Sequence, residues 1–312
     1  MVAIYNHDLN RYWNDVFADL ACVPHPDPWC NIDPLPIRSN EVSDAYAVRF
    51  SSMDGYPLFA YLHIPKSDGP HIPLFQAPGY GSVVAVPAYE RRAQYAVLAL
   101  CHRGQRLSNS EYQASYPGLL TDGLLSPDGD YVWQRIVLDC LRAVELLVQQ
   151  ENLDATRLAM SGGDLAWITA ALWDASDYLD EETLEFVKTD VLQTGGFIFA
   201  DLENRMTGEP DYPVREFNDY KRTYPGKWDE AKELLANYDP KVLAKNINTR
   251  KVMISCGPGE EQYVRELASA LSGETTVRVN LGKGHLDHIA QEEWLANACG
   301  IEPGPAHYPR TS

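Results

Sequence analysis

The chain has 312 residues, of which 45% are hydrophobic and 11% aromatic, enough to build the large core of an α/β domain with an insert. Its formal net charge is −18 and it has no Lys/Arg cluster, which argues against nucleic acid and anionic membrane surfaces as partners. No apolar run approaches the roughly 20 residues of a membrane span, and we expect no secretory signal. We therefore expect a small-molecule substrate, with neutral or cationic molecules favoured by the charge.

The six cysteines are scattered along the sequence, without CxxC pairs or paired histidines; they are at positions 22, 30, 101, 140, 256 and 299. This pattern is typical of reduced, mostly buried thiols rather than of a disulfide framework or a zinc site. We therefore expect a cytoplasmic protein that needs neither a metal ion nor another cofactor.

The N-terminal residues 1–45 are rich in proline and aromatic residues, and they predict a helix over about 9–20 followed by an extended arm. A hairpin is predicted from strands over 45–51 and 57–64. Further strands are predicted over 72–77, 95–101, 252–255 and 276–280, and helices over about 131–149, 167–173 and 291–299. Strands that alternate with helices after a hairpin indicate a mostly parallel sheet covered on both faces.

Residues 173–245 interrupt this alternation, because they are charged, rich in tyrosine and more helical than strand-like. They are predicted to form a lid over the carboxyl edge of the sheet, where ligand sites of α/β proteins lie. The domain prediction is therefore an arm (1–45), a core (46–172 and 246–312) and a lid insert (173–245).

Asp164 occupies the tip of a predicted strand–turn–helix segment. The strand is short and apolar, the turn contains two glycines, and small residues lie two positions before (Gly162) and two after (Ala166) the tip. This is the context of a nucleophile elbow, in which a strained tip residue projects one reactive side chain. The sequence therefore predicts Asp164 as the nucleophile.

Partners for such a nucleophile follow later in the chain. Glu260 comes just after a predicted strand, and His285 comes after the next strand and a glycine turn. The order nucleophile, acid, histidine is that of an α/β-hydrolase, so His285 is predicted as the base and Glu260 as the acid that orients it. Backbone amides around Gly79–Gly81, those of Tyr80 and Gly81 above all, are predicted to form an oxyanion hole together with the amide of Leu165.

Several motifs resemble one family, the acetyl xylan esterase/cephalosporin C deacetylase family. The run from Asp154 to Asp164 is similar to its V-D-x-x-R-I-x-V-x-G-G-S-Q-G-G, and Gly79-Tyr80-Gly81 to its H-G-Y-G. The remaining matches are His102-Arg103-Gly104-Gln105 with R-G-Q-G, Ile136…Asp139…Arg142-Ala143 with the helix before the elbow, Asn237-Tyr-Asp239 with Y-F-D, Gly257…Glu260 with G-x-x-D, and Gly284-His285 with G-H. The resemblance implies an α/β-hydrolase core, a Ser–His–Asp triad and assembly into homo-oligomers.

The sequence departs from this family at the chemical centre. The family serine falls on Asp164 and the family aspartate on Glu260. A carboxylate is a poor nucleophile for carbonyl carbon, because the product is a readily reversed anhydride, but it forms an ordinary ester with alkyl carbon. The predicted reaction is therefore hydrolysis of an epoxide or of a carbon–halogen bond. A lid tyrosine would protonate an epoxide oxygen, or the indole of Trp167 or Trp173 would bind a halide.

Other readings stay open at this stage. Ser161 also has small residues two positions away on each side, and with Ser161 as the nucleophile the protein would be an ordinary esterase. Attack by a water molecule that His285 activates is a further route to ester hydrolysis. His288 could replace His285, and Glu261 could replace Glu260. Gly79, Trp167 and Arg103 are predicted to line the substrate pocket, although Arg103 also suits a structural anchor. A binding or scaffold protein without catalysis is the remaining alternative.

Overall fold

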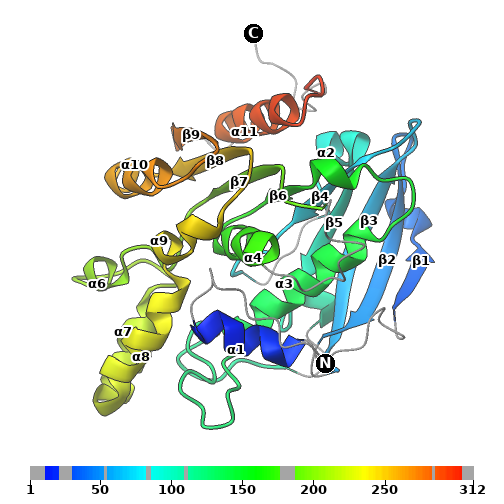
Figure 1. Cartoon of the computed structure of the whole chain (residues 1–312). Helices are drawn as coiled ribbons and strands as arrows, with labels where there is room; N and C mark the ends of the chain where they lie inside the picture. Colours follow the sequence, from blue (N-terminus) through cyan, green and yellow to red (C-terminus); the bar gives the residue numbers. More distant parts are fainter. Residues whose placement is uncertain are drawn as a thin grey trace.

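A single sheet crosses the molecule, as the computed structural model shows (Figure 1). The structure describes residues 11–20, 30–52, 55–81, 86–108, 112–175, 187–282 and 285–303, with only the backbone of 17–20, 155 and 285. Within these residues nine strands pair in the order β1-β2-β3-β5-β4-β6-β7-β8-β9. They are β1 (Asn31–Pro34), β2 (Ser43–Ser51), β3 (Pro57–Pro65), β4 (Ile72–Gln76), β5 (Tyr95–Cys101), β6 (Ala159–Ser161), β7 (Val191–Gly195), β8 (Lys251–Cys256) and β9 (Glu274–Val279).

Strand direction divides the sheet into two parts. β1, β2, β3 and β5 pair in antiparallel fashion, and β2 and β3 form the predicted hairpin. From β5 through β4 to β9 all neighbours are parallel, so their carboxyl ends lie along one edge. A parallel strand covered on both faces reads as a continuous apolar run, and every residue of β5 is buried.

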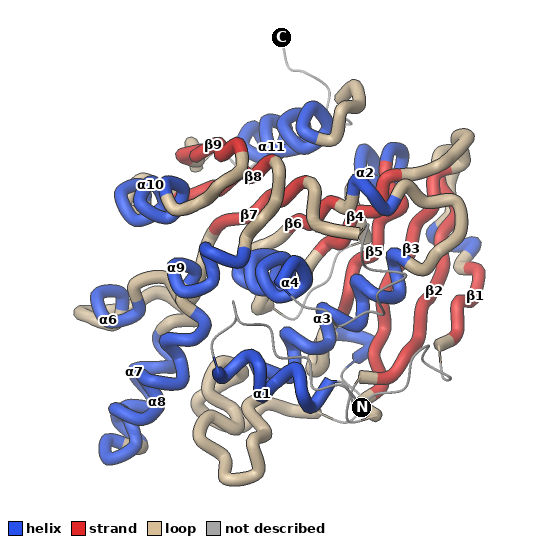
Figure 2. Tube along the Cα trace, in the orientation of Figure 1, coloured by secondary structure: helices blue, strands red, loops and turns tan. Residues whose placement is uncertain are grey.

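Helices cover both faces of the parallel part (Figure 2). α3 and α4 pack on one face, and α11 packs through Leu295 and Ala298 on the other, against β4, β5, β6 and β7. The helices are α1 (Arg11–Leu20), α2 (Tyr89–Gln94), α3 (Val132–Val148), α4 (Asp164–Ala175), α6 (Leu202–Arg205), α7 (Arg215–Thr223), α8 (Trp228–Leu235), α9 (Pro240–Leu243), α10 (Glu261–Ser269) and α11 (His285–Ala298). No helix in the described part of the chain is long and apolar enough to cross a membrane.

The segment predicted as a lid needs a correction. β7 lies inside residues 173–245 but belongs to the middle of the sheet, between β6 and β8. Gly195 ends β7 with φ +147°, and a Cβ there would lie 2.0 Å from the carbonyl oxygen of Ser255 on β8. This contact fixes Gly195 beside β8, and the additional helices α6 to α9 follow it in the chain.

The N-terminal arm is likewise not free of the sheet, because β1 lies within it and pairs with β2. Its helix α1 packs on the layer that follows β7: Trp13 is fully buried, and its Nε1 donates a hydrogen bond of 3.1 Å to the carbonyl oxygen of Asn237. Helix α11 begins at His285, several residues before the predicted start.

Candidate active site

The turn between β6 and α4 has the predicted strand–turn–helix form. Gly162 takes φ +155°, and a Cβ on it would lie 2.9 Å from the Cβ of Ala77 and 3.2 Å from that of Ala166. The glycine is therefore required by the close approach of β4 and α4. Asp164 is the first residue of α4 and is not among the described residues with positive φ, so the strain predicted for the tip falls on Gly162 instead.

Asp164 is buried, with 4% of its surface exposed, and it is held by the loop after β7. Its Oδ2 accepts a hydrogen bond of 2.5 Å from the amide of Ile198, and its Oδ1 one of 3.3 Å from the amide of Phe199. Burial raises the pKa of this carboxyl to about 6, although the two amides and Arg205 favour the charged form. Both oxygens are thus engaged in the protein, which is a poor arrangement for attack on a substrate.

A cavity of about 440 Å³ opens at the carboxyl ends of β6, β7, β8 and β9. Most of the side chains that line it carry hydroxyl or amide groups. Its wall includes Ser161, Gln193, Thr194, Ser255, Asn280, Gln291, Arg91 and Glu260, but not Asp164. The position at the carboxyl edge of a parallel sheet is the one at which α/β enzymes bind their substrates.

Ser161 belongs to a buried polar network in this wall. Its Oγ donates a hydrogen bond of 2.9 Å to Oε1 of Gln193. Oε1 of Gln193 also accepts a hydrogen bond of 2.9 Å from Nη2 of Arg91. Arg91 in turn forms an ion pair of 2.7 Å with Glu292 on α11. Gln193 Nε2 donates to the carbonyl oxygen of Gln291 at 2.8 Å. The network fixes the serine hydroxyl at the end of β6.

Sequence reasoning missed Arg91, Gln193 and Glu292. They come from three distant segments and form no motif, so their meeting depends on the fold. One signal was present: Gln193 interrupts the apolar strand Val-Leu-Gln-Thr-Gly, and a polar side chain at a buried strand position needs a partner.

The two candidate acids are placed differently. Glu260 lines the 440 Å³ cavity, and its Oε2 accepts a hydrogen bond of 2.9 Å from the amide of Gly257. Glu261 begins α10 and forms an ion pair of 2.6 Å with Arg265 on the same helix. The geometry therefore favours Glu260 as the acid of this cavity.

The two candidate bases both come from the start of α11. His285 is its first residue, after β9, but its side chain lies outside the described residues, as do Lys283 and Gly284. His288 lies one turn on, with its Nδ1 3.8 Å from Oε1 of Glu292, and is not part of the cavity wall. The pairings of Asp164 or Ser161 with His285 remain predictions.

The predicted oxyanion-hole residues are not brought to one wall. Tyr80 and Gly81 line a second cavity, of about 510 Å³, and Leu165 lines neither this cavity nor the one of about 440 Å³. The carbonyl oxygens of Gly79 and Gly81 both accept hydrogen bonds from Nε2 of Gln105, at 2.8 and 2.5 Å. Gln105 thus fixes the loop, and the amide of Leu165 lies in the first turn of α4, where helix amides lack intrahelical partners.

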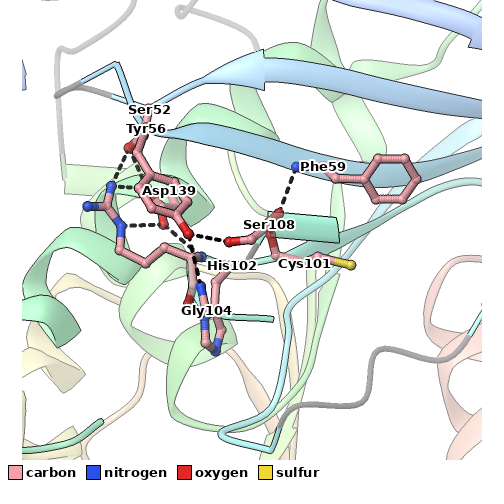
Figure 3. A network of polar contacts seen from close by, with 9 residues as sticks. Ser52, Tyr56, Phe59, Cys101, His102, Gly104, Ser108 and Asp139 are labelled. Carbon is pink, nitrogen blue, oxygen red and sulfur yellow. Dashed lines mark hydrogen bonds and ion pairs between the residues drawn. The ribbon is translucent and has the colours of Figure 1, made fainter. Parts of the chain in front are cut away.

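Arg103 is a structural anchor, and three of the residues that it contacts, Ser52, Tyr56 and Asp139, are labelled in Figure 3. Its Nη2 and Nε donate to the two oxygens of Asp139 at 2.7 and 2.9 Å, and Nη2 also donates to Ser52 at 2.8 Å. The guanidinium lies over the ring of Tyr56, 4.8 Å from its centre. Arg103 also lines the second cavity, but its charge is matched by Asp139.

The two indoles proposed as halide donors, and two of the lid tyrosines proposed as donors to an epoxide oxygen, are engaged elsewhere. The indole Nε1 of Trp167 donates to the carbonyl oxygen of Pro240 at 3.2 Å, and that of Trp173 to Val187 at 2.8 Å; both side chains are buried. Tyr220 donates to the carbonyl oxygen of Leu124 at 3.1 Å, and the hydroxyl of Tyr238 pairs with that of Tyr12. Trp167 is therefore a core residue, and these groups do not supply the predicted dehalogenase or epoxide chemistry.

Among the described residues, no group of three or more His, Cys, Asp or Glu side chains is arranged to hold a metal ion.

Comparisons with known proteins agree with the arrangement of the core. The family model described as acetyl xylan esterase (AXE1) matches residues 3–179, more than half of the chain. The acetyl xylan esterase from Paenibacillus sp. R4 is similar in structure, with a TM-score of 0.75, 20% identity and 94% of each chain covered. Acetyl xylan esterase 1 from Thermoanaerobacterium sp. JW/SL YS485 has a TM-score of 0.69 at 18% identity, over 93% of this chain and 94% of that one. These likenesses confirm the predicted α/β-hydrolase fold.

Proposed function

Because the chain belongs to the acetyl xylan esterase family, we propose that it is a carboxylic-ester hydrolase whose reaction takes place in the 440 Å³ cavity. One observation carries this proposal: Ser161 lies on the wall of the cavity, whereas Asp164, at the family serine position, is tied to the loop after β7. A hydroxyl at the carboxyl edge of the sheet suits attack on carbonyl carbon.

In the proposed reaction, Ser161 Oγ attacks the ester carbonyl and His285 takes its proton, with Glu260 as the orienting acid. The alcohol leaves, and water then releases the acid from the serine. At rest the serine hydroxyl donates to Gln193, whose amide oxygen is no base. His285 must therefore displace this hydrogen bond when substrate binds, and Gln193 holds Oγ in place until then.

Two other mechanisms compete with this proposal. If His285 activates water directly, ester hydrolysis needs neither Ser161 nor Asp164. If Asp164 attacks alkyl carbon, an epoxide or a haloalkane is the substrate, and the carboxylate must first leave the amides of Ile198 and Phe199.

The decisive experiment measures hydrolysis of p-nitrophenyl acetate, a small epoxide and a small haloalkane by the wild type and four variants. We expect ester hydrolysis, and we expect Ser161→Ala to lower kcat by on the order of 10³-fold. Ser255→Ala is the matched control, because it removes another hydroxyl from the same wall. Asp164→Asn should lower ester hydrolysis far less than Ser161→Ala.

Each other outcome contradicts the proposal in its own way. Retained ester hydrolysis in Ser161→Ala together with loss in His285→Asn would assign the attack to water. Turnover of the epoxide or haloalkane with ¹⁸O from water incorporated into Asp164 would restore the carboxylate mechanism. A wild type that converts none of the three substrates would favour a binding protein.

A further inference from the structure

The second cavity, of about 510 Å³, has three tyrosine rings in its wall, beside the amide side chains of Gln105 and Gln113. Tyr80, Tyr112 and Tyr212 line it. The rings of Tyr80 and Tyr212 meet edge to face, with centres 5.2 Å apart and planes at 79°, so they form a corner. The ring of Tyr112 lies over Gly104, where a Cβ would be 2.9 Å from Cδ1 of that ring. A cavity of this size accommodates a small organic molecule.

Two of these tyrosines are backed by carboxylates. The hydroxyl of Tyr80 donates to Oε1 of Glu216 on α7, and the other oxygen of Glu216 accepts a 2.9 Å hydrogen bond from the amide of Leu120. The hydroxyl of Tyr112 donates to Asp122. Burial, followed by these carboxylates, raises the pKa of both tyrosines, so each stays a neutral phenol that donates its proton outward. Such a hydrogen bond leaves the ring richer in electrons.

The charges around the cavity are unbalanced towards the negative side. Arg103 reaches the wall, but it is paired with Asp139 behind it. His102 also lines the cavity, and burial lowers its pKa to about 4, so it brings no positive charge at neutral pH. The acidic groups behind the rings are Glu216 and Asp122, and their hydrogen-bond partners are neutral. Burial raises the pKa of Glu216, although its hydrogen bonds from Tyr80 and Leu120 favour the charged form.

We propose that this cavity binds a small organic cation, of the quaternary or methylated ammonium class, against the faces of Tyr80, Tyr112 and Tyr212. Aromatic faces attract cations through the negative potential above the ring, and several rings that converge bind an ammonium group without a direct ion pair. The carboxylates behind Tyr80 and Tyr112 add to this potential, and the net charge of −18 raises the local concentration of cations. The inference does not depend on ester hydrolysis.

The test is calorimetric titration of the whole protein with choline and, separately, with 3,3-dimethylbutan-1-ol, at constant ionic strength. The two ligands have the same shape, but only choline carries a charge. We expect choline to bind at least about tenfold more tightly than the neutral alcohol, because the rings recognise the charge. A third titration with sodium acetate asks whether Arg103 makes the cavity an anion site.

Variants at Tyr212 locate the binding, because its side chain is 73% exposed and can be changed without disturbing the core. Tyr212→Leu should weaken choline binding by about threefold or more, whereas Tyr212→Phe keeps the ring and should bind within about twofold of the wild type. Tyr224→Leu is the matched control, an exposed tyrosine on the same helical layer that does not line the cavity.

Three results would overturn the proposal. They are equal affinity for choline and the alcohol, choline binding that Tyr212→Leu leaves unchanged, and acetate bound more tightly than choline. Because each readout is binding, a protein that hydrolyses no ester can still support the inference, and an active esterase can still refute it.

Discussion

Asp139 and Asp164 are both buried aspartates on the same side of the sheet, but the protein holds them in different ways. Asp139, on α3, is fully buried and shares its two oxygens with the guanidinium of Arg103. Asp164, at the start of α4, has two backbone amides and no basic side chain in direct contact among the hydrogen bonds and ion pairs of the described residues. Asp139 is one half of an ion pair, whereas the direct hydrogen bonds to Asp164 come from backbone amides, with Arg205 acting on it only at longer range.

The difference predicts that Asp139 contributes to stability as an ion-pair partner, whereas Asp164 contributes as a group that can be protonated. A buried ion pair fails when either partner is removed, because the remaining charge is left without compensation. A buried carboxylate held by amides can instead take up a proton, so the free-energy cost of burying it depends on pH. The predictions below test this contrast, beginning with the largest expected effect.

Removal of the cation from the ion pair should have the largest effect. Arg103→Met leaves Asp139 buried without its partner, and we expect the free energy of unfolding to fall by about 3–5 kcal/mol. Urea unfolding monitored by tryptophan fluorescence measures the change. The double variant Arg103→Met/Asp139→Asn should recover part of the loss, and a single variant as stable as the wild type would show that the pair is not the anchor described.

His63 is a buried base, and its contribution to stability should also depend on pH. Burial, with Arg92 and Arg38 nearby, lowers its pKa to about 4, and neither ring nitrogen has a hydrogen-bond partner among the described residues. The stability that its neutral form provides is present above about pH 6.5 and is lost as the pH falls through about 4. We expect about 3 kcal/mol of this loss between pH 7 and pH 4. His63→Leu should flatten the acid limb of the unfolding curve, and an unchanged limb would exclude His63 as its cause.

Asp164 should show the opposite pH dependence. Its pKa is raised to about 6, so the stability that its protonated form provides is present below about pH 3.8 and is lost as the pH rises through about 6. Relative to Asp164→Asn, the wild type should lose about 2 kcal/mol of unfolding free energy between pH 4 and pH 7. Parallel stability curves for the two proteins would mean that the carboxyl titrates as an ordinary aspartate.

Ser161→Ala should have the smallest effect on stability. It removes one hydrogen bond, but Gln193 Oε1 keeps the bond from Arg91, so we expect a loss of about 1 kcal/mol. Thermal unfolding beside Ser255→Ala measures it. A loss of activity in Ser161→Ala would then be chemical, whereas a loss of several kcal/mol would make the activity assay uninformative on its own.

Much of the core was predictable from local patterns. The continuous apolar run of β5 and the hairpin turn between β2 and β3 are set by neighbouring residues, so their boundaries follow from the sequence. The turn at Gly162 is also local, because close strand–helix packing excludes a side chain there. The sequence did not predict strand β7, which was assigned to the lid, because the strand is short and is followed by helical, charged sequence.

The site was predicted less well, because its geometry depends on long-range contacts. Spacing placed Asp164 at the family nucleophile position, but only the fold reveals that Ile198 and Phe199 bind its carboxylate. The hydrogen bond from the Trp167 indole to the carbonyl oxygen of Pro240 likewise could not be predicted from the sequence. The sequence could not separate Glu260 from Glu261, because the ion pair of Glu261 with Arg265 is set by helix α10; the role of Glu260 as the acid stays a prediction.

The close contact at Gly195 sets the boundaries for exchanging the helical layer between relatives. That layer is one continuous insertion between two adjacent core strands, so a chimaera would need its joints after Gly195 and before Lys251. A joint that replaced Gly195 with another residue would push β7 away from Ser255 and disrupt the pairing of β7 with β8. Grafts between these joints that keep Gly196 would leave the strands of the core and the lining of the 440 Å³ cavity unchanged, because that lining contains no residue between Gly196 and Ser255.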